Sequence, residues 1–233
     1  MIYRIADLDV KINNRFPFTD KFCKDYLVAD GERFDLEVSV SDEDLATEKK
    51  QSPDFSDGYI ENICIYRNIC NRMPAFNRFL MHCAVVEYDG KCYAFLGRSG
   101  TGKSTHTSLW LKNLPNAKIL NGDKPILLYD GDSFIVYGTP WQGKERLGYN
   151  GKCKLYGLCF LEQAKKNEIT RLTVGEAADR IFTQILLPND PVAVAKTLEL
   201  CDTLIKTVPS YLLKCDISDE AFQTSFNAME KGE

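Results

Sequence analysis

The stretch Gly97-Arg98-Ser99-Gly100-Thr101-Gly102-Lys103-Ser104 decides the fold of this chain. It has the spacing G-x-x-x-x-G-K-S, whose glycines let successive backbone N–H groups point toward one anion. An apolar run at residues 92–96 precedes it, and a helical pattern at residues 105–113 follows it. A strand, a glycine loop and a helix in this order are the setting in which the spacing binds nucleotide phosphates. The sequence therefore predicts a phosphate-binding loop.

The side chains of this loop add charge and a metal ligand. Lys103 is expected to neutralise the outer phosphates, and Ser104 to offer its hydroxyl to Mg²⁺, which bridges phosphate oxygens in such sites. The dipole of the following helix adds to the attraction for an anion. We expect ATP, or another nucleoside triphosphate, to bind with Mg²⁺ at Arg98, Ser99, Gly100, Thr101, Gly102, Lys103, Ser104 and Thr105.

A carboxylate follows the next apolar run. Asp123 lies in Asn121-Gly122-Asp123-Lys124, directly after the run at residues 117–120. Metal-assisted phosphate sites usually take a carboxylate from a neighbouring strand end. Asp123 is therefore expected to hold Mg²⁺ together with Ser104, directly or through water, or else to accept the proton of an attacking hydroxyl. The sequence leaves both roles open.

Two cations occupy a loop after a predicted strand. The loop at residues 138–146 contains Trp141, Lys144 and Arg146. Phosphoryl transfer is accelerated chiefly by positioning and by positive charge, so Lys144 and Arg146 are candidate catalytic clamps. Cations in a loop are also commonly solvated, and both interpretations remain open.

Two histidines are present. His82 lies in an apolar strand, where a histidine is more often a hydrogen-bonded structural group than a catalyst. His106 lies in the helix after the loop and is expected near the nucleotide or solvent rather than to act as a base. With these two histidines and no spaced cysteine cluster, the sequence does not predict a zinc site.

Apolar periodicity organises the remainder of the chain. Alternation at residues 8–12 and 34–40 predicts strands, and residues 41–53 form either a short helix capped by Ser41 and Asp44 or a solvated loop. A helical stripe, expected to pack in the core, is formed by Tyr59, Ile63, Tyr66, Cys70 and Met73. Further strands are predicted at residues 79–88, 92–96, 118–120, 125–129, 134–137, 155–161 and 211–215, and helices at residues 176–187, 192–206 and 219–229. We expect a strand-rich annex at residues 1–58 packed on a nucleotide-binding core at residues 59–233.

Composition limits the partners and the compartment. The 233 residues are 44% hydrophobic and 27% charged, and 29 Lys and Arg face 33 Asp and Glu, for a net charge of −4. This balance offers no general field for nucleic acid or anionic lipid, and no apolar run is long enough to span a membrane. The nine cysteines are odd in number, dispersed and without a C-x-x-C pair, which favours reduced thiols and a cytoplasmic location.

These motifs together resemble the kinase domain of HPr kinase/phosphorylase and its relatives, which share an unusual P-loop fold with phosphoenolpyruvate carboxykinase. The resemblance covers residues 79–162 and is carried by residues 81–86, the Asp89-Gly90 turn, the loop at residues 95–104 and Asn121-Gly122-Asp123. It implies an α/β fold with α+β character, in which helices flank a mixed β-sheet around a P-loop nucleotide-binding core. It also implies that the chain binds ATP and Mg²⁺, that His82 lies in the active site, that Asp123 is a metal ligand or a catalytic residue, and that the chain assembles into a homo-oligomer.

This sequence departs from the family's pattern in two places. HPr kinases carry two consecutive acids where this chain has Gly122-Asp123 or Asp123-Lys124, so one acid is missing, and the glycine that usually follows the histidine is Cys83. The chain also has too little sequence for the oxaloacetate-binding half of a carboxykinase.

The leading hypothesis is an ATP-dependent, Mg²⁺-requiring kinase that transfers the γ-phosphoryl group to a hydroxyl of a protein, peptide or small molecule. Its catalytic residues would be Asp123, Lys103, His82, Lys144 and Arg146. The alternatives are a catalytically impaired nucleotide-binding regulatory or accessory module and a simple ATPase. Loss of the second acid is the feature that favours these alternatives.

Overall fold

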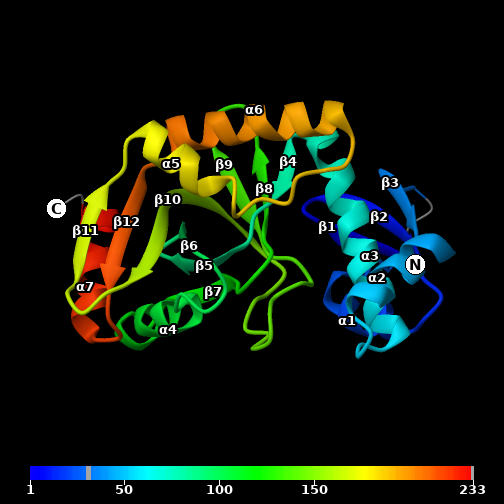
Figure 1. Cartoon of the computed structure of the whole chain (residues 1–233), viewed down its shortest axis with the longest axis horizontal. Coiled ribbons are helices and arrows are strands. Elements are labelled where there is room, and N and C mark those ends of the chain that lie inside the picture. Colours follow the sequence, from blue (N-terminus) through cyan, green and yellow to red (C-terminus); the bar gives the residue numbers. More distant parts are fainter. Residues whose placement is uncertain (30–32, 232–233) are drawn as a thin grey trace.

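A mixed sheet forms the centre of the molecule, seen in a computed structural model that describes residues 1–29 and 33–231 (Figure 1). In the described residues it has nine strands, in the order β4-β8-β9-β10-β6-β5-β7, with β12 beside β10 and β11 beside β12. The strands are β4 (Arg78–Leu80), β5 (Cys83–Tyr88), β6 (Lys91–Leu96), β7 (Lys118–Asn121), β8 (Ile126–Tyr129), β9 (Phe134–Tyr137), β10 (Lys152–Gln163), β11 (Glu168–Arg171) and β12 (Ser210–Cys215).

The long strand β10 joins the two parts of this sheet. It runs parallel to β6 and β12 and antiparallel to β9, while β5 is antiparallel to both β6 and β7. The turn between β5 and β6 has positive φ at Asp89 and Gly90, as the Asp-Gly pair predicts for a two-residue hairpin. Most residues of β5 and β6 are buried, because helices cover the sheet on both faces.

Two pairs of helices cover the two faces of the sheet (Figure 1). On one face lie α5 (Val174–Ile181) and α6 (Pro191–Thr207), with Leu200 and Leu204 in the same buried cluster as Phe79 and Phe160. On the other lie α4 (Lys103–Asn113) and α7 (Asp219–Phe226), which meet around the fully buried Trp110. Helix α7 continues into a helical turn at Asn227–Lys231. The mixed sheet between helices confirms the α/β class that the sequence predicts. None of the helices in the described residues has the length and apolarity needed to cross a bilayer.

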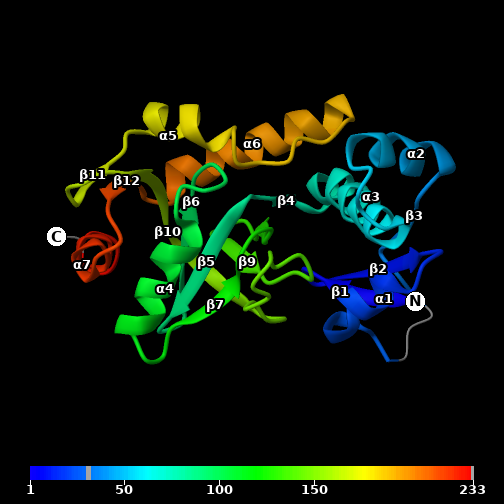
Figure 2. The same cartoon turned by 60° about the horizontal axis from the view of Figure 1, so that its bottom comes forward.

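The N-terminal residues form a second, smaller sheet (Figure 2). It consists of β1 (Ile2–Ile5), β2 (Leu8–Asn13) and β3 (Leu36–Ser39), and is accompanied by α1 (Phe18–Phe22), α2 (Asp42–Gln51) and α3 (Asp57–Arg72). Ser41 and Asp44 form a capping box, with the Ser41 hydroxyl accepting the Asp44 N–H at 3.1 Å. The helical alternative for residues 41–53 is therefore correct.

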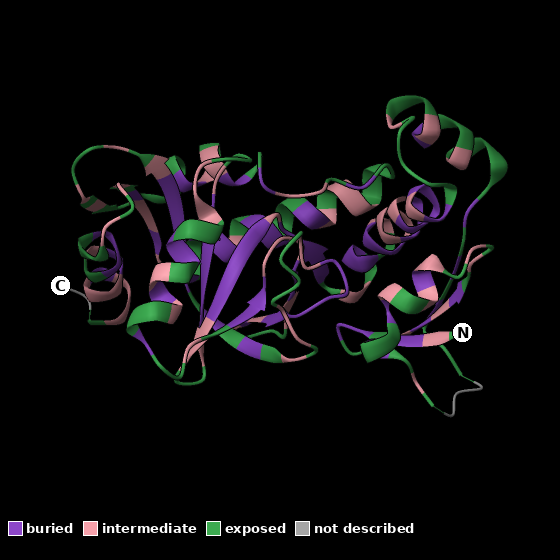
Figure 3. Cartoon of the chain, turned by 90° about the horizontal axis from the view of Figure 1, so that it is seen from below, coloured by how far each residue is buried: buried purple, intermediate pink, exposed green. Residues whose placement is uncertain are grey.

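Helix α3 packs with the N-terminal strands. Ile65 and Ile69 belong to the same buried cluster as Tyr3 and Ile12, and this cluster continues to Trp141 of the core. Figure 3 colours the buried residues purple, and they run through the central sheet. Because α3 begins at Asp57 and continues past residue 58 to Arg72, we propose that the annex extends to about residue 76. We use "annex" for residues 1–76 from here on.

Arg78 joins the annex to the sheet. Its side chain is buried, and its Nε and Nη1 donate to the carbonyl oxygens of Ala6 at 2.8 Å and Phe76 at 2.7 Å. Burial lowers the pKa of the guanidinium, and these two carbonyls supply its polar contacts in the interior.

One predicted helix is shorter, and one predicted strand is divided in two. The helix expected at residues 176–187 ends at Ile181, and the strand expected at residues 79–88 is interrupted at 81–82. These two breaks meet, because the His82 N–H donates to the Gln184 carbonyl at 2.6 Å and Met81 bridges to Ile185. Tertiary hydrogen bonds have here replaced those that would continue the helix and the strand.

Candidate nucleotide-binding site

The glycine loop leads from β6 directly into α4. Gly97, Gly100 and Gly102 have φ angles of 154°, 83° and 99°, a region that residues with side chains rarely adopt. Gly102 is the N-cap of α4 and provides no side chain to cap it. The first N–H groups of the helix thus lack an intrahelical partner and are suited to bind an anion.

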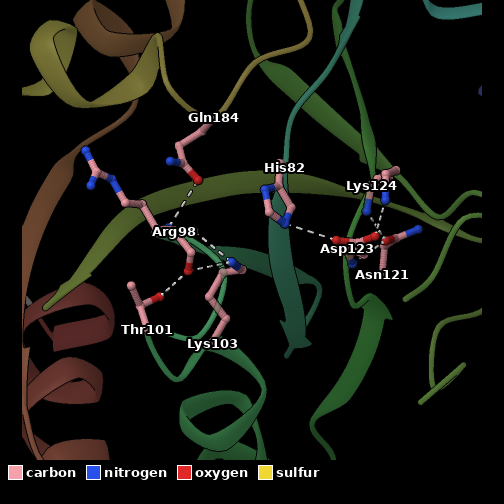
Figure 4. Close-up of polar contacts among 9 residues, drawn as sticks. His82, Arg98, Thr101, Lys103, Asn121, Asp123, Lys124 and Gln184 are labelled. Atoms are coloured by element: carbon pink, nitrogen blue, oxygen red, sulfur yellow. Dashed lines mark hydrogen bonds and ion pairs between the residues drawn. The ribbon is translucent and has the colours of Figure 1, made fainter. Parts of the chain in front are cut away.

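Lys103 folds back over the loop that precedes it (Figure 4). Its Nζ donates to the carbonyl oxygens of Gly97 at 2.7 Å and Arg98 at 3.3 Å. Burial lowers the pKa of this ammonium group. Ser104 and Thr105 are exposed instead and line a cavity of about 350 Å³ together with Gly122. The cavity therefore joins the start of α4 to the turn that contains Asp123.

Two glutamine side chains contact the loop, and an ion pair lies beside it. Gln163 at the end of β10 donates to the Gly100 carbonyl at 3.1 Å, and the Gly97 N–H donates to the Gln184 side chain at 3.3 Å. Arg180 of α5 pairs with Glu162 of β10 at 2.8 Å. Gln184 also accepts the His82 N–H through its backbone, so it connects the glycine loop to His82.

Asp123 is held between two basic groups (Figure 4). Its Oδ1 lies 3.0 Å from His82 Nε2, and its Oδ2 forms an ion pair with the ammonium of Lys124. Burial alone would raise the pKa of Asp123, but the hydrogen bonds from His82 and Lys124 outweigh it and lower the pKa to about 2. Asp123 is therefore a stable anion at neutral pH.

The buried Asn121 shapes the turn that carries Asp123. Its side-chain oxygen accepts the N–H groups of Asp123 at 2.9 Å and Lys124 at 2.8 Å, and its amide donates to the Thr139 hydroxyl at 3.0 Å. Thr139 in turn donates to the Lys124 carbonyl at 2.7 Å. These bonds fix the turn after β7 against the loop after β9, so the direction of the carboxylate does not depend on a bound ligand.

The donors near the loop suit Mg²⁺ rather than a metal held by protein alone. Within the described residues, no cluster of three His, Cys, Asp or Glu side chains could hold a metal ion. Mg²⁺ is usually bound by one or two carboxylates together with substrate phosphates, so a serine hydroxyl and one aspartate are a suitable donor set. Ser104 and Asp123 fit this chemistry.

The two cations of the loop after β9 lie beside Asp123 rather than on the glycine loop. Lys144 and Arg146 line a second cavity, of about 570 Å³, together with Asp123 and Lys124. The guanidinium carbon of Arg146 lies 4.6 Å from the ring centre of Phe22. The structure thus brings both cations to the cavity beside Asp123.

His106 does not lie near solvent, contrary to one of the two expectations for it. His106 is buried between α4 and α7, with Nε2 at 3.0 Å from the Ser225 hydroxyl and its ring against Phe95. Burial lowers the pKa of His106 to about 4, so it is neutral at pH 7. The cause is α7, which covers this face of α4 from a distant part of the sequence.

Lys124 and Gln184 are contacts of the site that the motifs do not reveal. Lys124 directly follows Asp123 and carries a charge of the opposite sign. Gln184 lies more than eighty residues after the loop and has no sequence signal of its own. Only the ion pair with Asp123 and the bond to Gly97 identify them.

Comparison with known proteins finds a distant structural likeness. No protein-family model matches the chain, and no curated protein matches it. Among solved structures, it is similar to the Hpr(Ser) kinase/phosphatase from Coxiella burnetii, with 11% identity and a TM-score of 0.30 over 55% of this chain and 88% of that chain. At this distance the likeness carries no conclusion about activity.

Proposed function

We propose that this chain is a Mg²⁺- and ATP-dependent phosphotransferase that acts on a hydroxyl group. The observation that carries the proposal is an anionic Asp123, held by His82, in the same network as the glycine loop. A phosphate-binding loop and a positioned carboxylate are the two parts that phosphoryl transfer to a hydroxyl needs most.

Each part of the site has a role in this proposal. The N–H groups at the start of α4 and Lys103 bind the triphosphate, for which the Lys103 ammonium turns from the loop carbonyls to the phosphates. Ser104 and Asp123 hold Mg²⁺, which when bound neutralises charge on the phosphate oxygens. His82 and Lys124 use two of the roughly four lone-pair positions of the Asp123 carboxylate, leaving others for the metal or its water and for the acceptor.

The transfer step follows from this arrangement. The acceptor oxygen forms a bond to the γ-phosphorus while the bond from phosphorus to the β–γ bridging oxygen breaks, and its electron pair leaves with ADP. The hydroxyl proton passes to Asp123 and then to water. With a pKa of about 2, Asp123 is a weak base, which suits a loose transition state in which the proton leaves late.

Nucleotide binding and acceptor phosphorylation test the proposal separately. Lys103→Ala should weaken ATP binding about tenfold or more in calorimetry, because the loop loses its charge-assisted contact. Asp123→Asn should bind ATP nearly as the parent does and form no phospho-product. Lys118→Gln, an exposed substitution at the start of β7, is the matched control and should change neither. Unchanged ATP affinity in Lys103→Ala would refute the phosphate-loop assignment.

A nucleotide-binding module without transfer is the second candidate, and Lys124 is the observation that favours it. Its ammonium neutralises the carboxylate on which transfer depends. Tight ATP binding, with neither ADP nor phospho-product in the presence of acceptors, would support the module. ADP formation without any acceptor would indicate a simple ATPase.

A further inference from the structure

The cavity beside Asp123 lies between the annex and the core. Its volume is about 570 Å³, within the range of small-molecule sites, which is about 300–1,000 Å³. Phe22 and Tyr66 line it from the annex, and Asp123 and Trp141 line it from the core. Because Asp123 lines this cavity, a molecule bound there lies at the carboxylate to which the proposed function assigns the acceptor hydroxyl.

Two buried polar atoms on the wall of this cavity have no protein partner. Asn62 is 3% exposed and Trp141 is 5% exposed, yet no described residue makes a hydrogen bond with Asn62 Oδ1 or Trp141 Nε1. By contrast, the indole of Trp110 donates to Ser225 at 3.0 Å. Buried polar groups normally have a partner, so these two residues each leave one hydrogen bond open beside the cavity: Asn62 Oδ1 can accept and Trp141 Nε1 can donate.

The charges on this wall favour an anion. In the part of the chain that the structure describes, neither Lys144 nor Arg146 forms an ion pair, and both line the cavity. The carboxylates that line it are already paired, Asp123 with Lys124 and Glu48 with Arg67. The cavity therefore has unpaired positive charge and no unpaired negative charge among its described residues.

Aromatic rings also line the cavity and favour a flat ligand. Phe18 and Tyr59 pack edge to face at 5.6 Å, and Tyr66 lies 5.5 Å from Trp141. The ring of a ligand can pack against such side chains edge to face or offset, as they pack against one another. Size, hydrogen bonding, charge and shape thus describe the same kind of ligand.

We propose that the cavity binds a small aromatic acid that carries a hydroxyl, and that this molecule is the phosphoryl acceptor. Its carboxylate would lie by Lys144 and Arg146, its ring among the aromatic side chains, and its hydroxyl by Asp123. The role as acceptor rests on the proposed phosphotransferase function, whereas binding itself does not require nucleotide.

The two tryptophans allow a direct test with ¹⁵N-labelled protein. The full chain is titrated with para-hydroxymethylbenzoate, and with its neutral carboxamide as the matched control, while both indole N–H signals are followed. Trp141→Phe assigns the signals by removing one of them. The carboxylate should shift the Trp141 signal in a saturable way and leave the Trp110 signal in place, because Trp110 lies in a different cluster.

The cations provide the second arm. Lys144→Gln combined with Arg146→Gln should weaken binding of the carboxylate about tenfold, whereas Lys118→Gln should leave it unchanged. Both cations are exposed, so the double variant should fold. An unmoved Trp141 signal, equal binding of the carboxamide, or equal affinity in the double variant would each overturn the inference.

Failure of this inference differs from failure of the proposed function. If the protein binds ATP but not the carboxylate, the acceptor inference is wrong and the phosphate loop stands. If it binds the carboxylate but not ATP, the cavity is a ligand site and the phosphotransferase proposal is wrong. A shift of the Trp141 signal by a serine-containing peptide but not by the aromatic acid would contradict the inference in favour of a peptide acceptor.

Discussion

Replacing Asp123 with asparagine should make the protein less stable at neutral pH and change how its stability depends on pH. The ordinary pKa of 3.8 falls to about 2 in the folded chain. A difference of about two pKa units corresponds to roughly 2 kcal/mol of stability from the ionised form. Asp123 is only 22% exposed, so solvent screens this contribution little.

The sign of the pH dependence follows from the lowered pKa. The stabilisation by Asp123 is complete above pH 4 and is lost as the pH falls toward 2, where the folded protein also takes up the proton. Wild type should therefore exceed Asp123→Asn by roughly 2 kcal/mol at pH 7 and by about half of that at pH 3. Urea unfolding at a series of pH values measures this difference.

The control for this experiment is Asp54→Asn. Asp54 is exposed and forms no ion pair in the described residues, so its replacement should change stability little at any pH. A wild-type advantage over Asp123→Asn that stays constant between pH 7 and pH 3 would refute the reasoning, because the ion pair would then not be its source. Equal stability at pH 7 would refute it as well.

Two further predictions concern packing and burial. Gly138→Ala should destabilise the protein by about 3 kcal/mol in urea unfolding, because a Cβ there would lie 1.9 Å from the Tyr149 carbonyl oxygen. Its control is Gly175→Ala, whose added Cβ would meet nothing within 4 Å and which should be neutral or stabilising. The lowered pKa of His106, about 4 against an ordinary 6.5, has no effect on stability above pH 6.5, where the imidazole is neutral in both states, and it destabilises the folded protein as the pH falls toward 4. Between these two values wild type should lose roughly 3 kcal/mol more stability than His106→Gln, and equal losses would show that His106 is not buried as a neutral group.

Local patterns predicted the central elements of this fold well. The hairpin between β5 and β6 follows from Asp89-Gly90, whereas for residues 41–53 the capping pair left a helix and a solvated loop open, of which the structure has the helix Asp42–Gln51. In each case the residues that determine the structure are within a few positions of one another. The glycine loop belongs to the same class, because its conformation is a property of its own three glycines.

Elements that depend on distant partners were missed. The turn between β1 and β2 has positive φ at Ala6 and Asp7, neither of which is a glycine, and β11 is mostly exposed and polar. Helix α5 stops at Ile181 although the helical pattern continues, because Gln184 and Ile185 bond to the chain near His82. No pattern in a single segment contains this information.

The candidate site shows the same division. The loop and Asp123 could be predicted, since each follows a strand in a recognisable motif. The stripe on α3 was expected to be core, and Cys70 and Met73 are buried, but Tyr59 and Tyr66 line the cavity beside Asp123. Whether the apolar face of α3 packs in the core or lines a cavity depends on the segment that lies opposite it. Here that segment is the loop after β9, whose Trp141 lies 5.5 Å from Tyr66.

The pairing of β10 with β6 and β12 also determines the order in which the protein can be completed during synthesis. The annex has all of its strands and helices once residue 76 has left the ribosome, so these can form before the glycine loop emerges, whereas the buried cluster that they share with Leu80, Ile126 and Trp141 is completed later. The loop emerges next, but Gln163 and Gln184, which support it, come later, and β12 closes the sheet later still. A nascent chain that stops before residue 210 therefore holds the complete phosphate motif without the strand that completes its support, so affinity for nucleotide should arise only late in translation.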